Sequence, residues 1–379
     1  MEGSVSSGKT WISLVLWAFW VKVSPRDKLY LMCAKSLTTL KRNCLILLQE
    51  LVGEGNFTFS IPSKEGHLFG RRVLFEGAND ARAESKIRGM TLQGAYCDEL
   101  TQLPEDFFAM LLSRLRLPGA KLIATTNPDN PNHWLMQNYI KRADELNFLD
   151  VKFTIDDNTT LPADYVENIK REYTGVFYNR FILGEWCIAE GLVYPMFSEK
   201  DHVVDDIPWQ ALQRGKWYIS VDYGTVNPTS AGLWCLWNGV SYRVDEYYYD
   251  SRKPGNRQKT DEEHYEGLEA LAKNRKIERV VVDPSAASFK ETIRRHGRFP
   301  VWDADNAVVD GIRLTATLLS SGRILIHRRC NGLLSEITAY RWDTDAPEDT
   351  VIKENDHACD DLRYFCSTIM EREVRASGV

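Results

Sequence analysis

The sequence has 379 residues, of which 44% are hydrophobic and 26% are charged, and this length predicts about two ordinary domains with sizeable cores. The formal net charge of −6 at pH 7 excludes a strongly basic module, although a carboxylate-rich metal site beneath a local rim of Lys and Arg stays compatible with DNA. The eight cysteines lack CxxC or zinc-type Cys/His spacing, which argues against structural zinc or a disulfide scaffold and suits reduced thiols in a cytoplasm.

The chain opens on a phosphate-binding pattern followed by an apolar run. Its first residues fit GxxxxGKT, in which backbone N–H groups curl around phosphates, Lys9 reaches the β- and γ-phosphates, and the Thr10 hydroxyl binds Mg²⁺. The apolar run 11–21 is shorter than the roughly 20 residues of a membrane-spanning helix, so we expect a buried core helix. The expected nucleotide-binding residues are Gly3, Ser4, Val5, Ser6, Ser7, Gly8, Lys9 and Thr10.

An acidic pair follows the second apolar stretch, which ends at Cys97. A P-loop ATPase needs one carboxylate at a strand end to hold Mg²⁺ and a neighbouring acid to activate the attacking water. Asp98 would be the Mg²⁺ partner and Glu99 the general base. Such a pair alone is more often a solvated strand end, but together with the P-loop it predicts nucleotide hydrolysis.

A third strand, residues 121–124, runs into Thr125, Thr126 and Asn127. Small hydroxyl and amide side chains beside a phosphate site can sense the γ-phosphate, although an ordinary Asn-Pro turn is the alternative. ATP hydrolysis at a P-loop also commonly uses an arginine finger, a side chain that stabilises the negative charge on the γ-phosphate. We expect Arg88 to be that finger, because it closely precedes the strand that ends before Asp98.

A change of pattern separates the two halves. Residues 190–214 contain Pro195 and Pro208 and predict a linker. A β-prone run then ends at Asp222, and two further strands flank Asn238-Gly239, the strongest short hairpin signal. A strand with a terminal Asp followed by an antiparallel hairpin is how an RNase-H-like sheet begins.

Two more acids complete a candidate metal site. A strand over 279–282 ends at Asp283, and a C-terminal helix carries Asp360 with His357 one turn away. Two strand-end carboxylates and one helix carboxylate can converge on two divalent ions about 4 Å apart, which would make a DNA phosphodiesterase. Each Asp alone is more often a cap or turn residue. The basic loop 251–259 suits phosphate contact without base reading, or is simply solvated.

The motifs resemble, in order and spacing, the large terminase subunits of tailed double-stranded DNA bacteriophages. The runs that carry the resemblance are GSVSSGKT, GAYCDELTQLPEDFF, LPGAKLIATTNPDNPNHW and YNRFILGEW, and the likeness covers nearly the whole chain. It implies Walker A positions at Lys9 and Thr10, a Walker B acid and catalytic glutamate at Asp98 and Glu99, and a coupling motif at Thr125, Thr126 and Asn127. It also implies nuclease metal ligands at Asp222, Asp283 and Asp360. The family usually has a small residue where Asp361 stands, so the choice between Asp360 and Asp361 stays open.

The resemblance implies an α/β protein with a mainly parallel P-loop ATPase domain over 1–189, a linker over 190–214, and an RNase-H-like nuclease domain over 215–379. It implies that ATP hydrolysis with Mg²⁺ drives double-stranded DNA into the procapsid, and that an endonuclease using two Mg²⁺ or Mn²⁺ cuts concatemeric DNA. The implied partners are the portal protein, the small terminase subunit and further copies of the chain in a ring, without a membrane. The implied location is the host cytoplasm, transiently at the procapsid portal, without secretion.

One departure and two alternatives accompany this interpretation. Family members carry a further stretch before the P-loop, with an adenine-contacting motif and the strand that feeds the loop, whereas this sequence begins two residues before Gly3. We therefore expect a poorly supported loop and doubtful ATPase activity, and the alternative is a truncated prophage remnant that retains only nuclease or docking function. An actin-like sugar kinase is a second alternative, since residues 222–225 read Asp-Tyr-Gly-Thr, but the upstream P-loop disfavours it.

Overall fold

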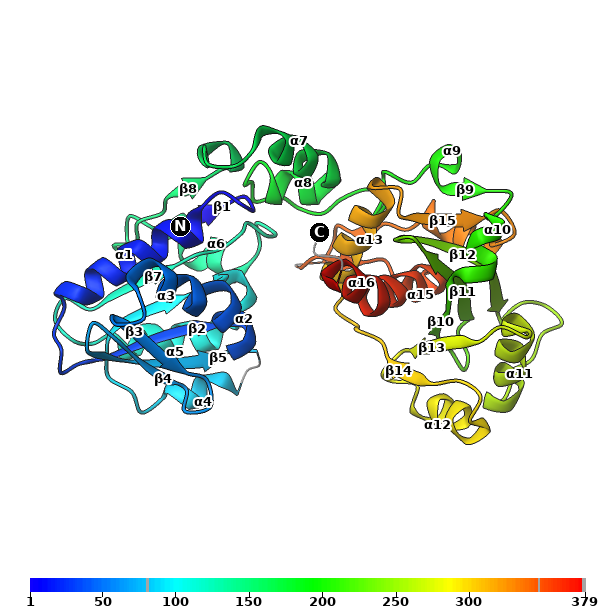
Figure 1. Cartoon of the computed structure of the whole chain (residues 1–379), viewed down its shortest axis with the longest axis horizontal. Helices are drawn as coiled ribbons and strands as arrows, with labels where there is room; N and C mark the ends of the chain where they lie inside the picture. The colour runs from blue at the N-terminus through cyan, green and yellow to red at the C-terminus, as the bar shows by residue number, and fades with distance from the viewer. Residues whose placement is uncertain (80–81, 347, 377–379) are drawn as a thin grey trace. The chain divides into compact units, whose positions relative to one another are not determined.

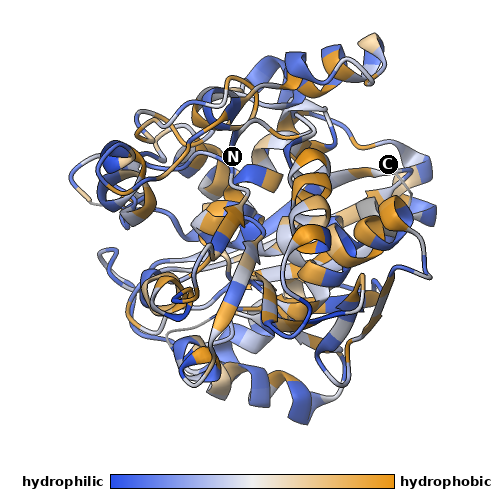
Figure 2. Ribbon diagram, turned by 90° about the vertical axis from the view of Figure 1, so that its left-hand side faces the viewer, coloured by the Kyte–Doolittle hydropathy of each residue, from blue (hydrophilic) through white to orange (hydrophobic). Residues whose placement is uncertain are grey.

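The computed structural model of the chain describes residues 1–79, 82–346 and 348–376, and it divides into two compact units (Figure 1). The first unit comprises Met1–Lys170 and Val176–Ile188, and the second comprises Arg171–Gly175 and Ala189–Val379. The domain bounds 1–189 and 215–379 stay a prediction. Figure 2 shows helices that are hydrophobic along one side and hydrophilic along the other, as helices that cover a core must be.

The first unit is built on a six-stranded sheet in the order β3-β4-β5-β2-β6-β7. The four strands from β5 to β7 in this order run parallel, and β3 and β4 add an antiparallel edge. The central strands are apolar and buried over nearly their whole length, as strands covered on both faces must be. The strands are β2 (Leu29–Ala34), β3 (Phe57–Ser60), β4 (Glu65–Leu68), β5 (Arg71–Gly77), β6 (Leu92–Cys97) and β7 (Lys121–Ala124).

Helices cover both faces of this sheet. Because strand side chains alternate, Tyr30 and Met32 pack into one core with α1, whereas Leu31 and Cys33 pack into the other with α4 and α5. The apolar run 11–21 lies in α1 and buries Trp17 fully, but Trp11 and Phe19 are 51% and 70% exposed, so the expected buried helix is buried along one side only. The helices are α1 (Lys9–Val23), α2 (Leu37–Leu40), α3 (Ile46–Val52), α4 (Ala83–Ile87), α5 (Glu105–Arg114), α6 (Trp134–Asn138), α7 (Ala163–Glu172) and α8 (Gly175–Phe181). Short turns form η1 (Lys41–Leu45), η2 (Leu100–Gln102), η3 (Ile140–Arg142) and η4 (Ile155–Asp157).

A short strand precedes the phosphate loop. The strand β1 (Glu2–Gly3) pairs in parallel with β8 (Lys152–Phe153), and Glu2 also bridges Thr126 just beyond β7. The Gly3 N–H donates to the Thr126 carbonyl at 3.2 Å, and the Glu2 N–H donates to the Val151 carbonyl at 2.9 Å. The expectation of a poorly supported loop is therefore wrong, because β1 pairs with β8 on one side and Glu2 bridges Thr126 on the other.

The second unit contains a seven-stranded sheet in the order β14-β13-β10-β11-β12-β15-β9. The central strand β10 pairs antiparallel with β11 of the β11–β12 hairpin on one side and parallel with β13 on the other, so the strand with the terminal Asp is followed by an antiparallel hairpin, as the sequence predicts. Asn238 and Gly239 both have positive φ, as a two-residue hairpin turn requires. The strands are β9 (Val203–Val204), β10 (Lys216–Asp222), β11 (Thr229–Trp237), β12 (Val240–Tyr249), β13 (Ile277–Val282), β14 (Val301–Asp303) and β15 (Ile324–His327), with a separate pair β16 (Trp342–Asp343) and β17 (Thr350–Val351).

Helices also flank this sheet. Tyr265 and Phe289 bring α11 and α12 into its core, and α15 packs against β10 and β11. The helices are α9 (Glu199–His202), α10 (Trp209–Arg214), α11 (Asp261–Ala272), α12 (Ala287–His296), α13 (Val308–Ser320), α14 (Asn331–Ile337), α15 (His357–Phe365), the π-helical turn η5 (Cys366–Met370) and α16 (Glu371–Ala376). None of the helices in the described ranges is long and apolar enough to cross a lipid bilayer.

The predicted linker over 190–214 is wrong as a structural description. It contains α9, β9 and α10, and β9 extends the seven-stranded sheet by pairing with β15. His202 and Ala211 are both buried. Pro208, which indicates a break when the sequence stands alone, is the N-cap residue of α10, where proline is well tolerated.

Candidate functional site

The predicted phosphate loop turns sharply between β1 and α1. Gly3 has φ 144° and Gly8 has φ 82°, and a Cβ atom at Gly3 would lie 1.8 Å from the Phe153 carbonyl oxygen. Both positions therefore need glycine. Gly8 is the N-cap of α1 and no side chain caps this helix, so the first N–H groups of α1 are left for a ligand such as phosphate.

The outer side of the loop is held by a later segment of the same unit. The Asn158 amide donates to the Ser6 carbonyl at 2.8 Å, and the Tyr165 hydroxyl lies 2.9 Å from Ser6 Oγ. The Val5 N–H donates to the Phe181 carbonyl at 2.8 Å. Beside the loop opens a pocket of about 290 Å³, lined by Ser6, Ser7, Gly8, Lys9, Thr10, Trp11, Asn158 and Leu161.

Lys9 reaches from the loop to the coupling residues. Its ammonium donates to Asn127 Oδ1 at 2.7 Å and to the Ser4 carbonyl at 2.8 Å. Burial lowers the pKa of Lys9 to about 8, although the charges of Glu99 and Asp98 act in the opposite direction. A buried ammonium of this kind gains stabilisation from an incoming anion, which suits its predicted contact with phosphate.

The predicted acids and coupling residues lie together at the carboxyl ends of β6 and β7. Asp98 is 1% exposed and accepts a hydrogen bond from the Thr125 hydroxyl at 2.9 Å. The Glu99 N–H donates to the same hydroxyl at 3.3 Å, and the Thr126 hydroxyl lies 2.9 Å from that of Thr101. The backbone of Glu99 has φ 50°, an uncommon conformation for a residue other than glycine.

A further contact to Asp98 had no signal in the sequence. The Asn43 amide in η1 donates to Asp98 Oδ2 at 3.1 Å. Together with Thr125, it fixes the orientation of the carboxylate that would face Mg²⁺. Only a long-range pairing between residues 43 and 98 could have revealed it.

Arg88, the expected arginine finger, lies away from the phosphate loop. Its guanidinium is exposed and pairs with Glu84, and its carbonyl accepts a hydrogen bond from Arg114 at the end of α5. Two residues further on, Arg116 reaches Thr91, just before β6 begins. Arg88 is therefore at the amino end of β6, opposite Asp98, and its assignment as the finger stays a prediction that would require the nucleotide site of a neighbouring subunit.

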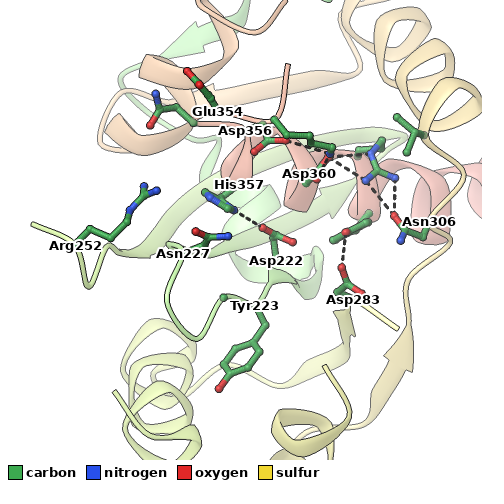
Figure 3. A pocket seen from close by; sticks show the side chains of 16 residues that line it. Asp222, Tyr223, Asn227, Arg252, Asp283, Asn306, Glu354, Asp356, His357 and Asp360 are labelled. Carbon is green, nitrogen blue, oxygen red and sulfur yellow. Dashed lines mark hydrogen bonds and ion pairs between the residues drawn. The ribbon is translucent and has the colours of Figure 1, made fainter. Parts of the chain in front are cut away.

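The second unit holds a pocket of about 670 Å³ that receives the three predicted nuclease acids (Figure 3). Asp222 comes from the end of β10, Asp283 follows β13, and Asp360 lies on α15. His357 Nδ1 is 2.8 Å from Asp222 Oδ2, and the Tyr364 hydroxyl donates to Asp283 Oδ2 at 2.8 Å. The fold therefore brings the three predicted acids to one cavity.

The acids differ in their electrostatic environment. Burial raises the pKa of Asp222 to about 6, although the hydrogen bond with His357 acts against this shift. For His357, burial lowers the pKa, but the hydrogen bond and charge of Asp222 outweigh it and the net shift is upward. For Asp283, burial raises the pKa, but the Ser285 N–H and the Tyr364 hydroxyl outweigh it and the pKa is lowered. Of Asp222 and Asp283, only Asp222 has a raised pKa, because burial outweighs its hydrogen bond with His357.

The structure separates Asp360 from Asp361. The Asp360 carboxylate accepts hydrogen bonds from Lys353 at 3.0 Å and from Arg363 at 2.9 Å, and it lines the pocket. Asp361 is fully buried on the other side of α15, where it binds Arg243 and the hydroxyls of Ser220 and Ser230. Of the two, only Asp360 faces the pocket.

The pocket contains the kind of ligand atoms that divalent ions prefer, but its side chains are not arranged to hold an ion in this structure. Carboxylate oxygens are the ligands that Mg²⁺ and Mn²⁺ prefer, and burial together with the nearby charge of Asp360 raises the pKa of Asp222. Within the part of the chain that the structure describes, however, no three or more His, Cys, Asp or Glu side chains are arranged to hold one ion. Lys353 and Arg363 occupy Asp360 instead. Metal binding by Asp360 therefore requires at least the Lys353 contact to open.

A residue from α14 caps the helix that carries His357 and Asp360. Glu336 accepts hydrogen bonds from the N–H groups of Ala358 and Cys359 at 2.6 and 3.2 Å and from the Tyr248 hydroxyl at 2.6 Å. The N-cap residue of α15 provides no side-chain cap of its own. Glu336 therefore fixes the start of α15, a role without any local motif in the sequence.

The basic loop after β12 is largely neutralised within the chain. Arg252 pairs with Asp250, Arg257 pairs with Glu263, and the Lys259 ammonium lies 4.1 Å from the centre of the Tyr249 ring. Arg252 also lines the pocket with the acids. Of the loop's cations, Arg252 is thus placed to meet a phosphate that enters the pocket.

Comparisons with known proteins give one consistent family. Residues 1–201 match the family model of the terminase large subunit, T4likevirus-type, N-terminal. The large terminase subunit of Escherichia phage T5 is 24% identical over 313 residues, which cover 77% of this chain and 68% of that protein. Among solved structures, the large terminase of a thermophilic bacteriophage is 38% identical with a TM-score of 0.91, over 97% of this chain and 93% of that chain. The same thermophilic phage protein has also been solved with ADP and with ATP-γ-S, at TM-scores of 0.88 and 0.87 and the same identity and coverage.

Proposed function

This chain belongs to the family of phage large terminase subunits, and from that premise we propose that it hydrolyses ATP to move double-stranded DNA into a procapsid and cuts concatemeric DNA with a second, metal-dependent site. The observation that carries the motor half is the meeting of Lys9 with Asn127 beside the buried Asp98. The observation that carries the nuclease half is the single pocket shared by Asp222, Asp283 and Asp360. The thermophilic phage relative with bound ATP-γ-S supports the choice of nucleotide.

In the proposed ATPase cycle, the N–H groups at the start of α1 bind the phosphates, and the Lys9 ammonium contacts the β- and γ-phosphates. Thr10 and Asp98 would hold Mg²⁺, which supplies positive charge to the phosphate oxygens. Glu99 accepts a proton from the attacking water. Asn43 and Thr125 keep Asp98 oriented through their hydrogen bonds.

The contact between Lys9 and Asn127 offers a route from hydrolysis to movement. In this structure the ammonium donates to the Asn127 amide oxygen, and a γ-phosphate would compete for the same ammonium. Asn127 then changes partner with each turnover, and Thr125 and Thr126 on the same strand end connect it to Asp98 and Thr101. This exchange is what the predicted coupling motif would use.

In the proposed nuclease, Asp222, Asp283 and Asp360 would hold two Mg²⁺ or Mn²⁺ ions, which would supply the positive charge needed to activate water and to stabilise the leaving oxygen. His357 orients Asp222, and Tyr364 orients Asp283. Arg252 contacts the DNA phosphate without reading a base. The proposal requires Lys353 to leave Asp360 when the ions bind.

Family membership supports the proposed partners. These are double-stranded DNA, the portal protein of the procapsid, the small terminase subunit and further copies of this chain in a ring. The protein would work in the host cytoplasm, transiently at the portal, and no membrane takes part. Membership also disfavours the sugar-kinase alternative, because a P-loop site and a separate acidic pocket leave that chemistry without a role.

The first experiment compares ATP hydrolysis by the wild-type chain, Lys9→Ala and Glu99→Gln, in Mg²⁺. We expect turnover by the wild type only, because Lys9 binds the phosphates and Glu99 acts on water. Addition of procapsids, portal and DNA should then give ATP-dependent protection of DNA from an added nuclease. A folded wild-type chain that cuts DNA in Mn²⁺ but never hydrolyses ATP would instead support the alternative, a terminase remnant with nuclease or docking function only.

A further inference from the structure

The pocket beside the phosphate loop extends beyond what phosphates need. Past Thr10 it is lined by Trp11, Asn158 and Leu161. Trp11 lies in the first turn of α1, and its residue surface is 51% exposed. An indole at a pocket mouth offers a flat apolar face to a ligand rather than to the core.

The direction in which a bound triphosphate would run indicates which part of a nucleotide lies beside Trp11. Lys9 points toward Asn127, on the side of Asp98 and Glu99 where the terminal phosphate must react. A triphosphate bound across the start of α1 therefore carries its nucleoside in the opposite direction. Trp11 and Leu161 line the pocket, whereas Asp98, Glu99 and Asn127 are not part of its lining.

Hydrogen bonds within the chain engage Asn158, the polar side chain of the lining that lies near Leu161 in the sequence. The Asn158 amide nitrogen donates to the Ser6 carbonyl, and its oxygen accepts a hydrogen bond from the Thr160 hydroxyl at 2.7 Å. Asn158 is thus used to hold the segment against the loop, and Tyr165 holds the same segment at Ser6 Oγ. Leu161 is therefore fixed relative to the phosphate loop before any ligand binds.

We propose that Trp11 and Leu161 form the nucleoside subsite of the ATPase, an aromatic and an aliphatic surface that hold the base by its ring faces. This inference rests on the proposed ATP-binding function and adds to it the residues that receive the base. Stacking on an aromatic ring suits any purine, because every base has a π-face. Asn158 and Tyr165 are positioning residues, because they act through the loop and the segment.

The test compares the binding of ADP with that of inorganic tripolyphosphate, each with Mg²⁺, by calorimetry on the full chain. Trp11→Ala and Leu161→Ala should each weaken ADP binding by about tenfold, which is about 1.4 kcal/mol, and leave tripolyphosphate binding within about twofold. Trp11→Phe should restore most of the ADP affinity. Phe19→Ala is the matched control, since Phe19 is an aromatic residue of the same helix, 70% exposed and outside the pocket lining, and it should change neither affinity.

Three results of these binding measurements would overturn the nucleoside subsite. ADP affinity that is unchanged in both alanine variants, or equal losses for ADP and tripolyphosphate, would overturn the subsite, because the effect would be absent or confined to the phosphate loop. A wild-type chain that binds tripolyphosphate but not ADP would also overturn it. A folded wild-type chain that binds neither probe would remove the proposed nucleotide site itself and, with it, this inference.

Discussion

The carboxylate of Asp361 and the guanidinium of Arg243 form an ion pair in which both side chains are fully buried, with Nη2 and Oδ2 3.0 Å apart. Arg243 lies on β12 and Asp361 on α15, so the pair ties the helix to the sheet. Trp234 lies beneath the guanidinium at 5.4 Å and donates its indole N–H to Ser220. This anchor sets the rotation of α15 that turns Asp360 toward the pocket.

The ion pair predicts different consequences for substitutions at two adjacent acids. Asp361→Asn leaves the buried Arg243 guanidinium with Glu246 as its remaining partner, 3.3 Å away, and should cost up to about 3–5 kcal/mol in the free energy of unfolding. Asp360→Asn removes the charge that faces the buried Arg363 but keeps a side-chain oxygen that can accept hydrogen bonds, and Lys353 is partly exposed. It should therefore cost less, about 1–3 kcal/mol, yet it should abolish DNA cleavage. Urea unfolding and a plasmid-cleavage assay measure both effects. Equal destabilisation by the two substitutions would contradict this account of α15.

The raised pKa of Asp222 predicts a conflict between stability and function. Its folded-state pKa of about 6 lies above the ordinary value of 3.8. The protonated carboxyl therefore contributes its full stability below pH 3.8, and this stability is lost as the pH rises through about 6. At pH 7.5 the ionised carboxylate should cost up to about 3 kcal/mol, from about 2 pKa units at about 1.4 kcal/mol each. Asp222→Asn should therefore melt at a higher temperature than the wild type at pH 7.5 in EDTA, while losing cleavage.

The pH dependence and the metal dependence supply the controls for Asp222. The advantage of Asp222→Asn should vanish near pH 4, where the wild-type carboxyl carries its proton. Added Mn²⁺ should raise the melting temperature of the wild type more than that of the variant, because the ion would supply the missing charge. A variant less stable than the wild type at pH 7.5, or an equal response to Mn²⁺, would show that Asp222 does not carry an uncompensated charge.

Lys353 predicts competition between a protein cation and the metal. Its ammonium contacts Asp356 and Asp360 at 3.1 and 3.0 Å, so it must be displaced before Asp360 can hold an ion. Lys353→Ala should lower the Mn²⁺ concentration that gives half-maximal cleavage by about fivefold, corresponding to about 1 kcal/mol for a partly exposed ion pair. The control is Lys276→Ala. The Lys276 side chain is 87% exposed, and its ammonium pairs with Glu278. An unchanged Mn²⁺ requirement for Lys353→Ala would exclude the competition.

Glu336 predicts a link between helix capping and the acidic pocket. Glu336→Ala leaves the N–H groups of Ala358 and Cys359 without their acceptor and should cost about 1–3 kcal/mol of stability. Glu336→Gln keeps one acceptor oxygen and should cost less. Both should reduce cleavage in the same order, while ATP hydrolysis by the first unit stays unchanged. Cleavage that is insensitive to both substitutions would show that the start of α15 does not position Asp360.

Features encoded by consecutive residues could be predicted from the sequence. The loop before Lys9 and its helix, the Asn238-Gly239 hairpin, and the acids that end β10 and follow β13 lie where their motifs indicated. Each depends on local backbone geometry, such as the positive φ of Gly8 and Gly239, and a short stretch of sequence is enough to specify it.

Features that depend on distant partners could not be predicted. Asn43 acts on Asp98, Asn158 acts on Ser6, and neither pair shares a local pattern. Asp360 and its neighbour are indistinguishable in sequence, because the rotation of α15 depends on Arg243 more than 100 residues away. The linker prediction failed because proline marks a turn equally well at a domain boundary and at the start of a helix such as α10.

The most direct test of the account measures ATP hydrolysis and Mn²⁺-dependent plasmid cleavage on the same preparations of wild type, Lys9→Ala and Asp283→Asn. Two separate sites in one chain predict that Lys9→Ala loses hydrolysis and keeps cleavage, and that Asp283→Asn keeps hydrolysis and loses cleavage. If both variants fold but each loses both activities, or if neither activity responds to its own substitution, the assignment of one motor site and one nuclease site is contradicted.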